Sequence, residues 1–138
     1  VVNAIGQSAY WSSSVIIVVW DDWGGFYDNV PPPFQDKWGG LGFRVPMLVV
    51  SPYAVTGSAG NSGTGYVSRT QYEFGSILKY IEQNWNLPSL GTTDVRANSM
   101  GDVLNYNQPP RGFSVINAKH DAKYFIDQPH VAQRGDPE

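Results

Sequence analysis

Several residue types that build common functional sites are missing from this chain or scarce in it. No cysteine occurs among the 138 residues, which excludes disulfide bonds and metal sites made of thiolates. The two histidines, His120 and His130, lie ten residues apart, in a stretch without a helical or hairpin pattern that would bring them together. A metal site built from histidine is therefore not expected.

Long apolar runs and clusters of positive charge are missing as well. No segment of the sequence approaches the roughly 20 apolar residues that span a bilayer, and the first residues lack the charged and then apolar pattern of a secretion signal. The chain carries 9 Lys and Arg against 12 Asp and Glu, a net charge of −3. Because the basic residues are scattered, they form no basic stripe of the kind that contacts a nucleic-acid backbone. Nucleic acid is therefore not an expected partner.

The sequence does contain one continuous apolar stretch that ends in acidic residues. Residues 14–20 read SVIIVVW, and Asp21, Asp22, Trp23 and a pair of glycines follow. Such a run is typical of a strand buried on both faces, as in a parallel sheet covered by helices. Ligands gather beyond the carboxyl ends of these strands, so the acidic pair stands where a functional site is expected.

Asp21 and Asp22 predict a site for a divalent metal ion. Neighbouring side chains of a regular strand point to opposite faces, but Gly24 and Gly25 allow a sharp turn that would bring both carboxylates to one side. Two adjacent carboxylates repel each other unless a cation lies between them, and oxygen ligands suit Ca²⁺, Mg²⁺, Mn²⁺ and Zn²⁺ alike. The alternative is an ordinary turn or helix N-cap, because Asp and Gly are common turn residues.

Two later segments bear on the same site. Asp28 could return to it as a third ligand or an outer acceptor, or it could cap local amides in an Asx-turn. Residues 45–51, VPMLVVS, predict a second buried strand. If this strand runs parallel to the first, Ser51 also lies at the carboxyl edge, but a proline follows it and we expect a structural role.

The clearest helix signal lies in the middle of the chain. Thr70 and Glu73 have the spacing of a capping box, and a helix is expected to end near Asn86 and the proline beyond it. The apolar residues at helical spacing are Phe74, Ile77, Leu78, Ile81 and Trp85. They predict a single apolar stripe that packs on a sheet. Arg69, just before this helix, could bind an anion such as phosphate, and a solvated arginine is the alternative.

The number of predicted strands bears on the domain organisation. Two buried strands are too few for a parallel sheet, which needs more strands and helices on both faces. We therefore expect residues 1–105 to be part of a larger, incomplete α/β domain, opening on the end of a helix in residues 1–11. Residues 106–138 are expected to form an extended, loop-rich tail, in keeping with 15 Gly and 10 Pro in the chain.

Several blocks together resemble a known family. They read WDDWGGFYD at residues 20–28, VPPP at 30–33, GLGFRVP at 40–46 and TQYEFGSIL at 70–78. Shorter blocks are DVRAN at 94–98 and NQPPR at 107–111. Their order along nearly the whole chain resembles the bacterial phosphoesterase family, which contains phosphatidylcholine-type phospholipases C and related acid phosphatases.

The resemblance implies the C-terminal part of an alkaline-phosphatase-like α/β fold, a mostly parallel sheet with flanking helices. It implies that Asp21 and Asp22 bind an active-site metal ion in an enzyme that hydrolyses phosphoesters, and that the Ser or Thr nucleophile lies upstream. It also implies a secreted or periplasmic location. The family often has histidine at the positions of Asn29 and Arg69. Neither residue can transfer a proton near neutral pH, although Arg69 could still hold a phosphate oxygen.

Two functions are open on the sequence alone. In the first, the parent protein is a metal-dependent hydrolase of phospholipid head groups or phosphomonoesters, and this chain supplies the ligands Asp21 and Asp22. In the second, the chain is a catalytically inactive fragment, or a surface that binds a metal ion or anion without turnover. The sequence does not distinguish among the phosphoester substrates, the metals or the oligomeric states.

Overall fold

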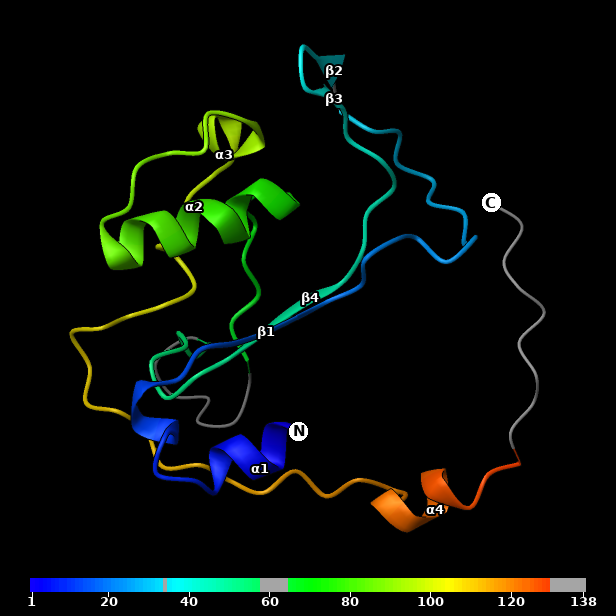
Figure 1. Ribbon diagram of the computed structural model, residues 1–138, viewed down its shortest axis with the longest axis vertical. Coiled ribbons are helices and arrows are strands. Elements are labelled where there is room, and N and C mark those ends of the chain that lie inside the picture. The colour runs from blue at the N-terminus through cyan, green and yellow to red at the C-terminus, as the bar shows by residue number, and fades with distance from the viewer. Residues whose placement is uncertain (34, 58–64, 130–138) are drawn as a thin grey trace.

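The computed structural model describes residues 1–33, 35–57 and 65–129. Its elements in chain order are α1 (Val2–Gly6), a 3-10 helix (Trp11–Ser13), β1 (Ile16–Val19), β2 (Gln35–Asp36), β3 (Gly39–Gly40), β4 (Met47–Val50), α2 (Phe74–Trp85), α3 (Thr93–Arg96) and α4 (Ala122–Ile126). The structure is mixed α/β, with two small two-stranded sheets (Figure 1). Within this part of the chain no helix has the length and apolar character to cross a membrane. His130 and the last eight residues of the predicted tail lie outside the described residues.

The main sheet pairs β1 with β4, and the two strands are antiparallel. The register places Ile17 opposite Val49 and Val19 opposite Met47. The expected parallel arrangement is therefore wrong for this pair, because a short apolar run indicates burial but does not fix strand direction. As a result the carboxyl end of β1 lies beside the amino end of β4, and Ser51 lies at the opposite end of the sheet from Asp21.

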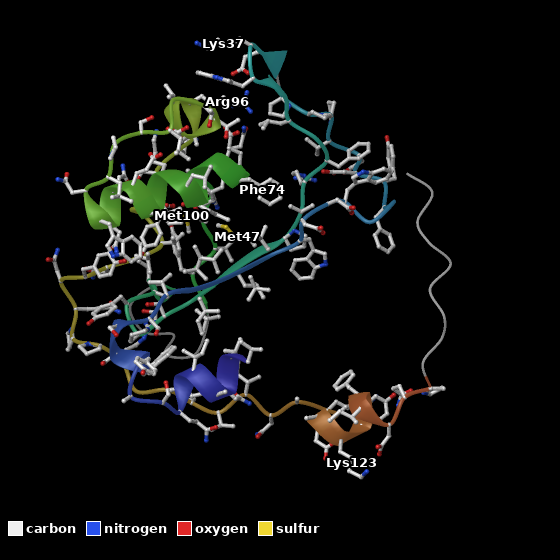
Figure 2. All side chains as sticks on the ribbon, in the orientation of Figure 1. Lys37, Met47, Phe74, Arg96, Met100 and Lys123 are labelled. Atoms are coloured by element: carbon white, nitrogen blue, oxygen red, sulfur yellow. The ribbon has the colours of Figure 1, made fainter. Side chains whose placement is uncertain are left out.

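The core lies on one face of this sheet, between the strands and α2. Its buried centre is Met100, Val103 and Leu104, and Figure 2 shows Met100 and Met47 between α2 and the two strands. The partly buried residues packed against this centre are Val15, Ile17, Met47, Val49, Tyr53, Tyr72, Ile77 and Tyr80. Alternation along the strands directs Ile17 and Val49 inward, whereas Leu48 on the other face is 55% exposed.

Helix α2 ends where the sequence predicts but begins later than predicted, with a different N-cap. It begins at Phe74 and is capped by Glu73, whose backbone N–H donates to the Ser76 hydroxyl at 3.2 Å. The prediction that Thr70 provides the cap is wrong, because the Thr70 hydroxyl instead donates to Asp102, at 3.1 Å. The helix ends as expected, with Asn86 in the left-handed region at φ 50°.

The predicted apolar stripe of α2 only partly faces the core. Ile77 packs into the core, together with Tyr80. The other stripe residues are between 36% and 62% exposed, and they are Phe74, Leu78, Ile81 and Trp85. The helix is rotated so that a tyrosine, which the apolar pattern omits, takes part in the buried face.

The segment after residue 110 runs back along the N-terminal part of the chain (Figure 1). The Asn3 side chain donates to the Ile116 carbonyl and accepts from the Ile116 N–H, both at 2.9 Å. The Trp11 indole N–H donates to the Arg111 carbonyl at 2.7 Å, and its ring meets Phe113 edge to face. The helix expected in residues 1–11 is shorter than predicted and covers only Val2–Gly6 (α1).

Candidate functional site

The loop after β1 contains the sharp turn that the sequence predicts. Gly24 and Gly25 have φ values of 62° and 76°, and the Phe26 N–H donates to the Trp23 carbonyl at 3.1 Å. Two consecutive residues with positive φ define a turn that side-chain-bearing residues seldom adopt. The two glycines therefore let the chain reverse immediately after the acidic pair.

Asp21 and Asp22 lie exposed at the start of this turn. The Asp22 N–H donates to Oδ1 of Asp21 at 2.9 Å, and the Gly24 N–H donates to Oδ1 of Asp22. Local backbone donors thus orient one oxygen of each carboxylate. Among the described residues no group of three or more His, Cys, Asp or Glu side chains could hold a metal ion, so a metal site with Asp21 and Asp22 as ligands stays a prediction.

Asp28 pairs with an arginine that the sequence interpretation did not connect to it. Arg44 donates from Nε to Oδ2 at 2.7 Å and from Nη2 to Oδ1 at 2.8 Å, and the Val30 N–H donates to Oδ1 at 3.1 Å. The hydrogen bond from the Arg44 side chain is the main reason why the pKa of Asp28 lies well below its usual range. The Asx-turn is thus confirmed, and the ion pair fastens the loop to the chain entering β4.

Aromatic side chains surround this ion pair. The Phe43 ring meets the rings of Trp23 and Tyr27 edge to face, at centroid distances of 5.2 and 6.0 Å. A cavity of about 420 Å³ is lined by Trp23, Phe26, Tyr27, Asp28, Arg44, Val45 and Pro46. The acidic pair is therefore followed directly by aromatic residues that line this cavity.

Arg69 lies exposed in a segment that is anchored on both sides. The hydroxyls of Ser68 and Thr70 both donate to Oδ2 of Asp102, at 2.6 and 3.1 Å, and the Tyr72 hydroxyl donates to Oδ1. Burial raises the pKa of Asp102, but the hydrogen bonds from Ser68 and Tyr72 outweigh this effect and leave the pKa lowered. The carboxylate thus fixes the chain around Arg69.

A larger cavity of about 1100 Å³ extends between β4 and the start of α2. Val19, Arg44, Ser68 and Thr70 are among the residues that line it. Neither the acidic pair nor Arg69 is part of its lining. The structure therefore does not bring Arg69 into a shared cavity with Asp21 and Asp22.

Arg96, in one of the family-like blocks, connects three separate elements. Its guanidinium binds Glu73 at 2.9 Å and Asp36 at 2.5 Å, and Nη1 donates to the Gly39 carbonyl at 3.1 Å. The hydrogen bonds that Arg96 donates to Glu73 and then to Asp36 raise the pKa of Arg96. Figure 2 shows Arg96 on α3, facing the β2–β3 hairpin. This arginine holds the hairpin against the start of α2.

Asp94, in the same block, is fully buried. Its carboxylate accepts from the Thr92 N–H at 2.7 Å, the Thr92 hydroxyl at 3.0 Å, the Gly91 N–H at 3.3 Å and the Ser89 hydroxyl. These donors, the Ser89 hydroxyl first, lower the pKa of Asp94. Its acceptor sites are used within the turn, so it stabilises the start of α3 and is not placed to bind a ligand.

Comparison with known proteins places these features in a family. The model of the Phosphoesterase family matches residues 1–88, which include β1, the acidic pair, the Asp28–Arg44 ion pair, β4 and α2. The chain belongs to the phosphoesterase family. The resemblance stated from the sequence is therefore confirmed. No solved structure matches the chain.

Individual relatives are named phospholipases C. The chain is 30% identical over 128 residues to non-specific phospholipase C6 of Arabidopsis thaliana, covering 80% of this chain and 25% of that protein. It is also 30% identical over 132 residues to phospholipase C A of Mycobacterium tuberculosis, covering 77% of this chain and 24% of that protein. The chain thus spans about a quarter of the length of the curated relatives it matches.

Proposed function

We propose that the whole protein is a metal-dependent hydrolase of phosphoesters, and that Asp21 and Asp22 are ligands of its metal ion. The observation that carries this proposal is the family match over residues 1–88, which contains the acidic pair on an ordered, exposed turn. Relatives named phospholipase C support phospholipid head groups as substrates, with phosphomonoesters as the related class.

The acidic pair suits a hard divalent cation. Within the described part of the chain each carboxylate accepts one local hydrogen bond, at its Oδ1 atom, so both aspartates keep lone pairs that a cation could use. When bound, such an ion polarises the phosphoryl group and lowers the pKa of the attacking hydroxyl. The contribution of this chain is to orient two carboxylates; the nucleophile and the remaining ligands are proposed to lie in other parts of the whole protein.

Three further features of the whole protein are proposed on the family resemblance. Arg69 contacts a phosphate oxygen of the substrate, because it is an exposed cation held by its anchored neighbours. The β1–β4 pair belongs to a larger, mostly parallel sheet of the alkaline-phosphatase type, in which these two strands form an antiparallel pair. The whole protein acts in a secreted or periplasmic location.

The proposal is tested in the whole protein with Asp21→Asn and Asp22→Asn. Each variant is expected to lose bound metal, measured by elemental analysis, and to lose roughly 100-fold or more of its phosphoesterase activity, because a ligand and a negative charge are removed. Asp127→Asn is the matched control, since Asp127 is an exposed aspartate on the C-terminal segment. Unchanged metal content and activity in both variants would contradict the proposal.

The 138-residue chain by itself supports a second candidate function, the binding of a metal ion or anion without turnover. The observation that favours it is that the described residues offer exposed carboxylates but no group of three or more metal-binding side chains. The purified chain is assayed with a soluble phosphomonoester and Mg²⁺, Ca²⁺, Mn²⁺ or Zn²⁺. Turnover that a chelator abolishes would rule this candidate out.

A further inference from the structure

We propose that the loop after β1 docks on the surface of a zwitterionic phospholipid bilayer through an aromatic rim. The rim consists of Trp20, Trp23, Phe26 and Tyr27. The inference rests on the proposed function, because it takes a phospholipid as the substrate. It adds the surface by which the protein reaches that substrate.

The rim gathers four exposed aromatic side chains within a short stretch of the chain, residues 20–27. Phe26 and Tyr27 are 80% and 83% exposed, and Trp20 and Trp23 are 50% and 47% exposed. Trp23, Phe26 and Tyr27 line one cavity, and exposed apolar groups that lie together in this way mark interaction surfaces. Trp and Tyr, with an apolar body and one polar atom, are the side chains enriched at membrane interfaces.

The rim is also held in a fixed shape before anything binds to it. Gly24 and Gly25 form the turn that presents Phe26. The two-point ion pair between Asp28 and Arg44 fastens the far side of the loop. A surface ordered in advance loses less conformational entropy on docking, so more of the burial energy of its aromatic rings is available for binding.

The charges beside the rim favour a neutral lipid surface over an anionic one. Residues 20–28 carry three acidic residues, Asp21, Asp22 and Asp28, and no Lys or Arg, and Asp28 is paired with Arg44 from the chain entering β4. Without a bound metal ion, the acidic pair would be repelled by anionic lipids; with one, the loop would be close to neutral. A phosphatidylcholine surface does not repel the loop in either case, because its head group has no net charge.

The position of the rim links docking to the chemistry proposed for the loop. Trp20 and Trp23 directly flank Asp21 and Asp22 in the sequence, and the glycine turn joins them to Phe26 and Tyr27. Seating these rings among lipid head groups would bring lipid phosphates to the acidic pair. No such approach is needed for a soluble phosphoester, and this difference provides the test.

The test compares the double variant Phe26→Ser/Tyr27→Ser with the matched control Tyr10→Ser/Phe125→Ser in the whole protein. The control removes one phenylalanine and one tyrosine that are 64% and 75% exposed elsewhere on the chain. Binding to phosphatidylcholine vesicles is measured by co-sedimentation. Hydrolysis is measured on the same vesicles and on soluble p-nitrophenyl phosphorylcholine.

The rim variant is expected to bind vesicles about tenfold more weakly or worse, as lost burial of two aromatic rings implies. The ratio of its vesicle activity to its soluble activity falls by a similar factor, whereas the control keeps the parent ratio. Unchanged vesicle binding would overturn the inference. So would an equal loss of both activities together with a lower melting temperature, because the rings would then pack against another part of the protein.

A separate variant distinguishes this inference from the proposed function. Asp21→Asn is expected to abolish both activities while vesicle binding persists. If Asp21→Asn keeps full activity but the rim variant loses vesicle binding, the metal-site proposal fails and the docking surface stands. If Asp21→Asn is inactive and the rim variant binds vesicles normally, the docking surface fails and the proposed function stands.

Discussion

Residues 20–28 and residues 89–104 both carry aspartates within family-like blocks, but they use them in opposite ways. In the second region Asp94 is fully buried and accepts four hydrogen bonds from neighbouring groups. In the first region Asp21 and Asp22 are exposed, and a single backbone N–H donates to each. One region uses carboxylates to build the fold, and the other presents them to solvent.

This difference shows how an aspartate that stabilises the fold can be distinguished from one that is available to bind a ligand, although both lie in family-like blocks. A carboxylate whose acceptor sites are filled by its own chain cannot take up a cation or substrate without losing those hydrogen bonds, and the loss of buried ones is costly. An exposed carboxylate in an ordered turn can bind a cation without that loss. Burial and the number of donors, rather than membership of a family-like block, therefore decide which aspartate is available for chemistry.

The largest difference between the two regions is expected in how much a substitution lowers the free energy of unfolding. Met100→Ala should lower the free energy of unfolding by about 2–5 kcal/mol, because it leaves a cavity at the centre of the core. Phe26→Ala, in the exposed loop, is the control and should change it by about 0.5 kcal/mol or less. Urea denaturation followed by fluorescence measures both values. Equal destabilisation by the two substitutions would remove the distinction between core and loop.

A smaller, pH-dependent effect is expected at Asp94. Because its pKa is lowered in the folded state, its ionised form stabilises the fold above the usual aspartate pKa of about 3.9, and this contribution is lost as the pH falls toward the lowered folded-state pKa. Asp94→Asn should therefore be less stable than the parent at pH 7. The difference in stability between the two proteins should become smaller as the pH is lowered. The measurement is the urea midpoint at pH 7, 5 and 3. A difference that is constant with pH would show that ionisation of Asp94 does not stabilise the fold.

The local features of the chain could be predicted from its sequence. The presence of α2 followed from apolar spacing, its end followed from Asn86, and the turn after Asp22 followed from two consecutive glycines. Both depend on residues that are close together in the chain. The structural role of Ser51 is also confirmed, since its hydroxyl donates to the Ser14 carbonyl at 2.9 Å and accepts from the Tyr53 N–H at 3.1 Å.

The features that could not be predicted depend on contacts between distant residues. The antiparallel pairing of β1 with β4 depends on the path by which residues 20–46 bring the chain back beside β1. The apolar runs of the sequence do not specify that path. The partners Asp28 and Arg44 are 16 residues apart, and Arg96 reaches back to Glu73, 23 residues away. The displacement of the N-cap from Thr70 to Glu73 has the same origin, because Asp102 takes up the Thr70 hydroxyl.

The central claim is that Asp21 and Asp22 together bind a divalent cation, and thermal melting of the whole protein with Mg²⁺, Ca²⁺, Mn²⁺ or Zn²⁺ tests it most directly. At about 100 times its Kd, a metal ion that binds the folded chain stabilises it by about 2.7 kcal/mol. We predict that at least one of these ions raises the melting temperature of the whole parent protein, and that no ion raises that of its Asp21→Asn/Asp22→Asn variant. The same rise in the double variant, or no response of the parent to any of the four ions, would contradict the account.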